Sequence, residues 1–187
     1  VAYQFQESSL HVLFVCTGNI CRSPTAERLA AAWGSRLGIP DFTTSSAGTR
    51  AVVGHPIHPD AARVLQDLGG DVSEFAARQL TPRIASGADL ILAMTRAHRD
   101  AVLEVAPSKL RRTFTLSEAA QIITEQNARN VADLATLRAH INSAEAPDVD
   151  DPIGQGSEVF AAVGAQLAAL LPPIVELCHK MAAPADD

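Results

Sequence analysis

The chain of 187 residues suits one α/β domain with a sizeable buried core. Hydrophobic residues make up 47% of it and aromatic residues 4%, so we expect a core built mostly from aliphatic side chains. The net charge of −6 argues against general nucleic-acid and anionic-membrane binders, which carry an excess of basic residues.

Short apolar runs alternate with amphipathic segments, a pattern typical of a parallel sheet with helices on both faces. We expect four strands, at His11–Cys16, Phe42–Thr49, Ala88–Thr95 and Arg111–Leu116. The first helix follows the first strand, with Ser23 at its N-cap, Pro24 at N1 and Gly38 as its stop. Further helices are expected at His58–Gly70, at Arg96–Pro107, over most of Ser117–Ala144, and at Ser157–Leu171, where the last one resumes after Pro172-Pro173 as far as Met181. The fold class is therefore α/β with three layers and four parallel strands. We expect one domain over residues 1–187, with flexible ends at 1–10 and 182–187.

The segment that links the first strand to the first helix has the pattern C-x5-R, from Cys16 to Arg22. Ligand sites of α/β folds lie at such junctions, where free N–H groups and the helix dipole favour an anion. Gly18 helps the loop to curl, and Arg22 offers a two-pronged contact to phosphate oxygens. The pattern predicts a phosphate loop between strand and helix.

Cys16 stands at the base of this predicted loop. The same positive field favours its thiolate form, which is placed for in-line attack on phosphorus to give a cysteinyl-phosphate. A Walker-type phosphate loop is excluded because the chain has no Gly-Lys pair, and a C-x2-C redox or zinc pair is also absent. By itself C-x5-R is a loose pattern, and a buried structural cysteine beside a surface arginine would also produce it.

The stretch VLFVCTGNICRSPTAE, followed in order by SSAGT, ARQLT, DLILAMT, DDP and FAAV, resembles the low-molecular-weight protein tyrosine phosphatase family. The resemblance runs from about His11 to Leu171 and implies hydrolysis of phosphate monoesters without a metal or cofactor. It implies that Cys16 is the nucleophile, Arg22 binds phosphate and Asp151 protonates the leaving oxygen. The residues that it places around the substrate are Thr17, Gly18, Asn19, Ile20, Cys21, Arg22 and Ser23, of which Asn19 and Ser23 also hold the loop and stabilise the thiolate.

An acidic donor is also expected from the chemistry, because expelling an alkoxide or phenolate needs a proton. The stretch DVDD offers Asp148, Asp150 and Asp151, although a solvated acidic loop would look the same. Pro152 restricts the backbone of Asp151 to extended conformations and so fixes the direction of its side chain. The implied substrate is a phosphotyrosine protein or a small phosphate ester, with a kinase as partner.

The chain departs from the family pattern at several places. Phe75 stands where many members carry a histidine that braces the loop asparagine, so the brace on Asn19 must come from elsewhere or be missing. Ile153-Gly154 and Ala51–Val53 stand where many members carry aromatic residues, which weakens the expectation of a phosphotyrosine-stacking wall. Ile20 matches tyrosine-directed members, whereas arginine-phosphate phosphatases that resemble the family have threonine there.

The remaining cysteines and histidines have simpler interpretations. Cys21 is either a small loop side chain or the partner of Cys16 in a reversible disulfide that protects the nucleophile. Cys178 is expected on a helix face, and Trp33 in the core. His55 and His58 are expected to cap a helix, because no carboxylate–histidine set accompanies them as metal ligands.

Two alternative functions stay open. A thiol-dependent arsenate reductase of the same fold would need more cysteines to relay oxidation. A catalytically impaired phosphate-binding module would explain the missing histidine and aromatics. Three scattered cysteines, no signal-peptide pattern and no apolar run near ~18 residues predict a cytoplasmic protein without membrane insertion.

Overall fold

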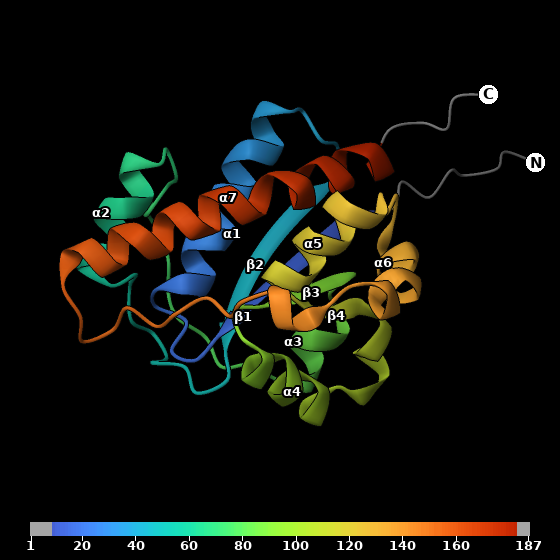
Figure 1. Ribbon diagram of the computed structural model, residues 1–187. Helices are drawn as coiled ribbons and strands as arrows, with labels where there is room; N and C mark the ends of the chain where they lie inside the picture. Colours follow the sequence, from blue (N-terminus) through green and yellow to red (C-terminus); the bar gives the residue numbers. More distant parts are fainter. Residues whose placement is uncertain (1–8, 183–187) are drawn as a thin grey trace, which may run out of the picture.

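A four-stranded parallel sheet of order β2-β1-β3-β4 forms the centre of the computed structural model, which describes residues 9–182 (Figure 1). The strands are β1 (Leu10–Cys16), β2 (Phe42–Gly48), β3 (Leu90–Ala93) and β4 (Thr113–Thr115). All three strand pairs are parallel, which confirms the predicted fold class. The last two strands are shorter than predicted. For β4 the reason is that residues 107–112 form a 3-10 helix ahead of it and α5 begins at Leu116.

Helices cover both faces of the sheet. They are α1 (Arg22–Arg36), α2 (Pro59–Asp67), α3 (Pro82–Ser86), α4 (Arg96–Val105), α5 (Leu116–Gln126), α6 (Val131–Leu137) and α7 (Ser157–Ala182), with 3-10 turns η1 (Pro107–Arg112), η2 (Arg138–His140) and η3 (Ser143–Glu145). Val12 and Phe14 of β1 pack with α1, α2, α5 and α7, whereas Leu13 and Val15 pack with α3 and α4. This alternation buries both faces of β1, as its continuous apolar run requires.

The strand order places a switch point between β1 and β3. The chain leaves β1 toward β2 on one side and returns to β3 on the other, so the loops that follow β1 and β3 diverge. In open α/β sheets this crevice at the carboxyl ends of the strands is where ligands bind. The loop Cys16–Arg22 follows β1, and Thr95 follows β3, so both border the crevice.

The start of α1 differs from the prediction. The helix begins at Arg22 with Cys21 as its N-cap residue, and Cys21 makes no side-chain capping bond. Ser23 is not the N-cap because its hydroxyl is hydrogen-bonded to the Cys16 thiol and the Asn19 amide instead. The predicted stop holds: α1 ends at Arg36, and Gly38 follows with φ +64°.

The C-terminal helix also differs, because α7 continues through Pro172 and Pro173 without a break. Both prolines lie away from the core. Because Pro173 has no N–H, the carbonyl of Ala169 has no helical partner, but Ala169 is exposed to water. The predicted flexible ends lie mostly outside the described residues, but Leu10 belongs to β1 and Ala182 to α7.

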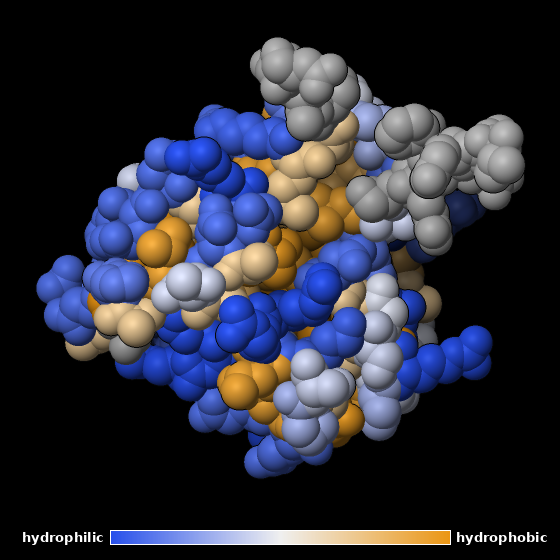
Figure 2. All heavy atoms as spheres, turned by 90° about the vertical axis from the view of Figure 1, so that its right-hand side faces the viewer, coloured by the Kyte–Doolittle hydropathy of each residue, from blue (hydrophilic) through white to orange (hydrophobic). Residues whose placement is uncertain are grey.

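This continuity makes α7 the one helix in residues 9–182 whose length and hydropathy would suit a membrane span. We expected no such segment from the sequence. The helix nevertheless belongs to the core, since Leu167, Leu171 and Ile174 are buried among residues of the central cluster. The face drawn in Figure 2 shows apolar side chains only in patches between hydrophilic ones. The length and hydropathy of α7 thus coincide with a place in the core of the domain.

Packing of α1 on β2 generates a first prediction. Glycine inside an exposed helix normally costs about 1 kcal/mol relative to alanine, but a Cβ on Gly34 would lie 2.4 Å from Cδ1 of Phe42. We therefore expect Gly34→Ala to lower the free energy of unfolding by about 1–3 kcal/mol, measured by urea denaturation. Ala31, which is exposed on the same helix, provides the reverse control. There Ala31→Gly should cost about 1 kcal/mol, and a stabilised Gly34→Ala protein would contradict the packing.

Candidate active site

The loop that follows β1 turns its carbonyl groups outward. Those of Cys16, Thr17, Gly18 and Ile20 accept hydrogen bonds of 2.7–3.0 Å from backbone N–H groups of segment 49–58. In a trans peptide the N–H points opposite to the C=O, so the N–H groups that follow these carbonyls point inward. None of them donates to another group in the part of the chain that the structure describes. Convergent free N–H groups form a nest for an anion, with the buried Cys16 at its base.

The close fit of this loop against β2 depends on Gly48. A Cβ on Gly48 would lie 2.4 Å from the carbonyl oxygen of Thr17. That oxygen accepts the N–H of Arg50, so moving it aside would also break one of the bonds that turn the loop carbonyls outward. The sequence SSAGT therefore carries its glycine where the two backbones approach.

Asn19 holds the loop from inside. It is fully buried and has φ +56°, in the left-handed region that few residues other than glycine occupy. Its Oδ1 accepts the backbone N–H of Arg78 at 2.8 Å, and its Nδ2 donates to the hydroxyls of Ser23 and Ser46 at 2.9 and 2.8 Å. All hydrogen-bonding positions of the amide that point into the protein are thus used, and they offset the cost of the strained backbone.

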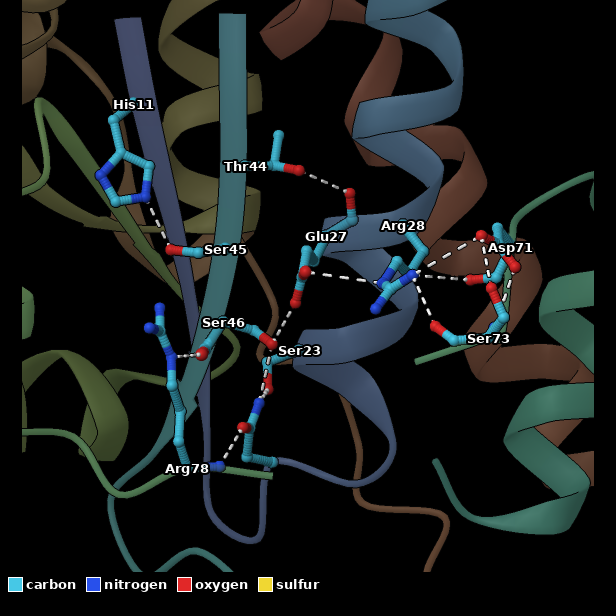
Figure 3. Close-up of polar contacts among 11 residues, drawn as sticks. His11, Ser23, Glu27, Arg28, Thr44, Ser45, Ser46, Asp71, Ser73 and Arg78 are labelled. Carbon is cyan, nitrogen blue, oxygen red and sulfur yellow. Dashed lines mark hydrogen bonds and ion pairs between the residues drawn. The ribbon is translucent and has the colours of Figure 1, made fainter. Parts of the chain in front are cut away.

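The two hydroxyls are in turn hydrogen-bonded to Glu27 and Cys16. Ser46 donates to Glu27 at 2.5 Å, as part of the chain of contacts between α1 and β2 in Figure 3. Ser23 lies 2.9 Å from the sulfur of Cys16, and its hydrogen is free to point there because its oxygen already accepts from Asn19. A hydroxyl donor at this distance stabilises a thiolate. Burial raises the pKa of Glu27, and the bond from Ser46 opposes that shift.

The departure at Phe75 does not leave Asn19 without support. The backbone of Arg78 and the pair Ser46–Glu27 supply its contacts, and Phe75 instead packs under the guanidinium of Arg28 at 5.6 Å. None of these partners was predicted from the sequence. Glu27 had a usable signal, since it lies four residues after Ser23 on the same face of α1.

Arg22 and Asp151 meet across the pocket. The guanidinium is buried, donates to the carbonyl of Val149 at 2.9 Å, and forms an ion pair with Asp151 in which Nη2 and Oδ2 are 2.9 Å apart. The Asp151 side chain is half exposed, and its Oδ1 accepts the N–H of Ile153 at 3.2 Å. Asp148 instead accepts from Arg96 at the start of α4. Asp150 and Asp151 are both exposed, but of the three aspartates Asp151 is the one paired with an arginine of the loop.

A pocket of about 200 Å³ opens above the Cys16 sulfur. Its walls include the aliphatic side chains of Val52 and Ile153, which are 39% and 44% exposed. These residues stand at the places where the sequence lacks the expected aromatic side chains. Arg50 adds a cation at the rim. The predicted substrate-binding residues that line the pocket are Thr17, Gly18, Ile20, Cys21 and Arg22; Asn19 and Ser23 lie behind the loop and support it.

His98 on α4 is a further residue beside the loop that the sequence did not single out. Its Nε2 is 2.8 Å from the hydroxyl of Thr17, and its Nδ1 is 2.9 Å from the hydroxyl of Thr95. Burial, assisted by the charge of Arg22, lowers the pKa of His98 to about 4. The imidazole is therefore neutral at neutral pH and ties the phosphate loop after β1 to the loop after β3.

The other cysteines are both unbonded and buried. Burial, with a contribution from Cys16, raises the pKa of Cys21 to about 12, so its thiol is protonated at neutral pH. The reversible disulfide with Cys16 stays a prediction. Cys178 lies in the core on α7, as expected for a helix-face residue.

His58 is the N-cap of α2, which confirms the predicted capping role, whereas His55 is exposed and precedes the helix. Trp33 is only partly buried and packs against the edge of the core. Within the described residues no group of three His, Cys, Asp or Glu side chains is placed to hold a metal ion.

Known proteins resemble this chain in sequence and in structure. Residues 11–119 match the sequence model of the family described as low molecular weight phosphotyrosine protein phosphatase. A probable low molecular weight protein-tyrosine-phosphatase of Ralstonia nicotianae, EpsP, is 41% identical over 110 residues, which cover 59% of this chain and 72% of EpsP.

Solved structures of the same kind superimpose over almost the whole fold. The low molecular weight protein tyrosine phosphatase from T. tengcongensis has a TM-score of 0.73 and 32% identity, covering 90% of this chain and 99% of its own. The arginine phosphatase YwlE from Geobacillus stearothermophilus has a TM-score of 0.69 and 30% identity, covering 89% of this chain and 91% of its own. The similarity therefore spans relatives with two different substrate groups.

The buried imidazole of His98 generates a second prediction. Its pKa of about 4 lies below the ordinary value of 6.5, so between these pH values the unfolded chain binds a proton that the folded chain does not. Stability is therefore lost as pH falls through this window. Between pH 7 and pH 4.5 the free energy of unfolding should fall by about 2 kcal/mol more in the wild type than in His98→Asn. Urea denaturation at both pH values measures this, and equal losses in the two proteins would contradict it.

Proposed function

The chain belongs to the low molecular weight phosphotyrosine protein phosphatase family, and we propose that Cys16, Arg22 and Asp151 carry out its hydrolysis of phosphate monoesters. The observation that carries this assignment is the position of the Cys16 sulfur. It lies at the base of a nest of free N–H groups, with the Ser23 hydroxyl 2.9 Å away. A sulfur anion, an anion-binding nest and an arginine within one loop are what in-line phosphoryl transfer requires.

In the first step the Cys16 thiolate attacks phosphorus from the base of the loop. The S–P bond forms as the bond from phosphorus to the leaving oxygen breaks, and that oxygen takes a proton from Asp151. The inward N–H groups and the Arg22 guanidinium hold the charge on the equatorial phosphoryl oxygens. The inertness of Cys21 as a protonated thiol leaves Cys16 as the single nucleophile of the loop.

Arrival of the substrate changes the surroundings of Asp151. Without substrate its carboxylate is paired with Arg22, Nη2 to Oδ2 at 2.9 Å. A phosphate dianion bound to the N–H nest competes for the same guanidinium and displaces the carboxylate. Released from Arg22, the Asp151 carboxyl is free to turn toward the leaving oxygen. The exchange thus prepares the acid when the leaving group is in place.

In the second step water attacks phosphorus and the S–P bond breaks, returning the electron pair to Cys16. The ionised Asp151 accepts a proton from that water, so the same residue acts first as acid and then as base. Ser23 again donates to the departing thiolate. Inorganic phosphate leaves, and Asp151 can pair once more with Arg22.

We propose that the physiological substrate is phosphotyrosine in a protein. In this proposal the phosphatase acts in the cytoplasm and reverses the reaction of a tyrosine kinase. Ile20 supports tyrosine over arginine phosphate, and Val52 and Ile153 offer aliphatic sides to an aromatic ring. The whole described chain is proposed to act as one domain, since α7 packs on α1 and α2. The arsenate reductase alternative gains no support, because Cys178 is buried in the core of α7.

The nucleophile generates a third prediction. Cys16→Ser should abolish turnover of p-nitrophenyl phosphate while inorganic phosphate still binds, because the backbone nest and Arg22 are unchanged. Isothermal titration calorimetry measures the binding and a colorimetric assay the turnover. In the wild type, iodoacetate should label Cys16 ahead of Cys21 and Cys178, whose pKa values are raised to about 12 by burial. Retained turnover in the serine variant would exclude the covalent intermediate.

The acid generates a fourth prediction. Asp151→Asn should lower kcat by roughly 10²–10⁴-fold for phenyl phosphate, and by less for p-nitrophenyl phosphate, whose leaving group departs more easily as an anion. The exposed Asp150 provides the matched control, and Asp150→Asn should retain wild-type kcat on both substrates. If Asp150→Asn shows the leaving-group-dependent loss and Asp151→Asn does not, the acid has been assigned to the wrong neighbour.

A further inference from the structure

A second pocket lies outside the phosphatase site, and most of the residues that line it belong to the segment between β4 and Asp151. It has a volume of about 280 Å³ and is bordered by α5, by residues 145–147 and by the middle of α7. Figure 1 shows α5 below α7 with the chain that leads to Asp151 in front. The pocket residues have no part in the proposed phosphoryl transfer. We call this pocket the α5 groove.

Polar atoms in the α5 groove lack partners. Within the described part of the chain, the hydroxyl of Ser117, a residue only 5% exposed, has no hydrogen-bond partner. The same is true of the buried Oε1 of Gln121, one turn later on the same helix face. The amide nitrogen of Gln121 is used, because it donates to Glu125 at 3.1 Å. Buried polar groups of native proteins are normally bonded, so an unpartnered hydroxyl and acceptor that line one groove point to a ligand with hydrogen-bond donors.

Charge narrows the class of that ligand. Glu125 and Glu145 both border the groove and are exposed, while no lysine, arginine or histidine among residues 9–182 borders it. Two arginines close in sequence to these segments or their neighbours are engaged in other ion pairs: Arg138 pairs with Glu118, and Arg96 with Asp148. Glu125 also lies in the last turn of α5, where the helix dipole favours a positive charge. A cationic donor group therefore fits this end of the groove.

The rest of the lining is apolar, with Ala120, Ala146, Pro147 and Leu170 forming the walls. A long aliphatic stem with a cationic head matches such walls, because the stem packs on them while the head reaches polar atoms at the rim. Arginine fits better than lysine, since its planar guanidinium donates to several acceptors at once. We propose that the α5 groove binds an arginine side chain of a partner protein, with the guanidinium between Glu125, Glu145 and the Oε1 of Gln121.

The groove is joined to the phosphatase site by a short stretch of backbone. Pro147 borders the groove, the carbonyl of Val149 accepts from Arg22 at 2.9 Å, and Asp151 pairs with the same arginine. Val149 is further held by its N–H, which donates to Met94 at 2.9 Å. A partner bound in the groove thus contacts the stretch of backbone that carries Asp151, so binding there can affect the active site.

The test is a ¹⁵N–¹H NMR titration of the full chain with inorganic phosphate present, so that the active site is occupied. The probe is the capped tripeptide acetyl-Gly-Arg-Gly-amide, and the matched control replaces arginine with citrulline, which has the same shape without the charge. The arginine peptide should shift amides in 117–125 and 145–147, and the citrulline peptide should bind roughly tenfold more weakly. Equal binding of both peptides, or no shifts in these residues, would overturn the proposal.

Variants place the interaction on the named carboxylates. The double change Glu125→Gln and Glu145→Gln should weaken arginine-peptide binding roughly tenfold, whereas Glu104→Gln, an exposed glutamate on α4, should leave it unchanged. Turnover of p-nitrophenyl phosphate should be the same in all three proteins, which confirms that they are folded. Unchanged binding in the double variant would show that the peptide sits elsewhere. Concentration-dependent shifts of the same amides without peptide would show that a second copy of the chain fills the groove.

Discussion

The phosphatase site depends on one buried side chain, the amide of Asn19. A left-handed residue at the middle of the loop curls it into a nest, and that backbone holds only while the amide keeps its bonds to Arg78, Ser23 and Ser46. The same bonds orient the Ser23 hydroxyl toward the Cys16 sulfur. Loop shape and thiolate stabilisation are therefore set together, and a side chain that loses one contact loses part of both.

Two oppositely charged groups of different burial face each other above the loop. Arg22 is 4% exposed and donates to the carbonyl of Val149, whereas Asp151 is 48% exposed and lies on the segment that precedes α7. The cation is therefore held inside the protein, whereas the carboxylate borders the solvent. This difference suits their proposed duties, since phosphate needs a fixed anchor and a leaving group that varies between substrates needs an acid that adjusts.

The residue pattern predicted the parallel sheet, which the structure confirms, and a phosphate loop between the first strand and the first helix. Together with the family resemblance it also proposed Cys16, Arg22 and Asp151 as the site residues. These features follow from local signals: apolar runs, a C-x5-R spacing and a proline after an aspartate. The bond from Arg78 that supports Asn19 and the contact of His98 with Thr17 could not be predicted, because they join residues far apart in the sequence. The separations are 59 and 81 positions, respectively. The start of α1 was misplaced for a local reason: Ser23 has ordinary capping chemistry, but its hydroxyl is bonded within the loop to Asn19 and Cys16.

The bonds that turn the loop carbonyls outward run from backbone to backbone. Thr49, Arg50 and Val52 contribute only their N–H groups to them, so their side chains are left free for other uses. A mutation that changes the side chain of Arg50 or Val52 alters what the pocket mouth can accept without loosening the nest beneath it. The site is thus divided between a main chain that forms the anion nest and side chains at the pocket mouth that can change independently of it, so the preferred substrate can change while the nest is kept.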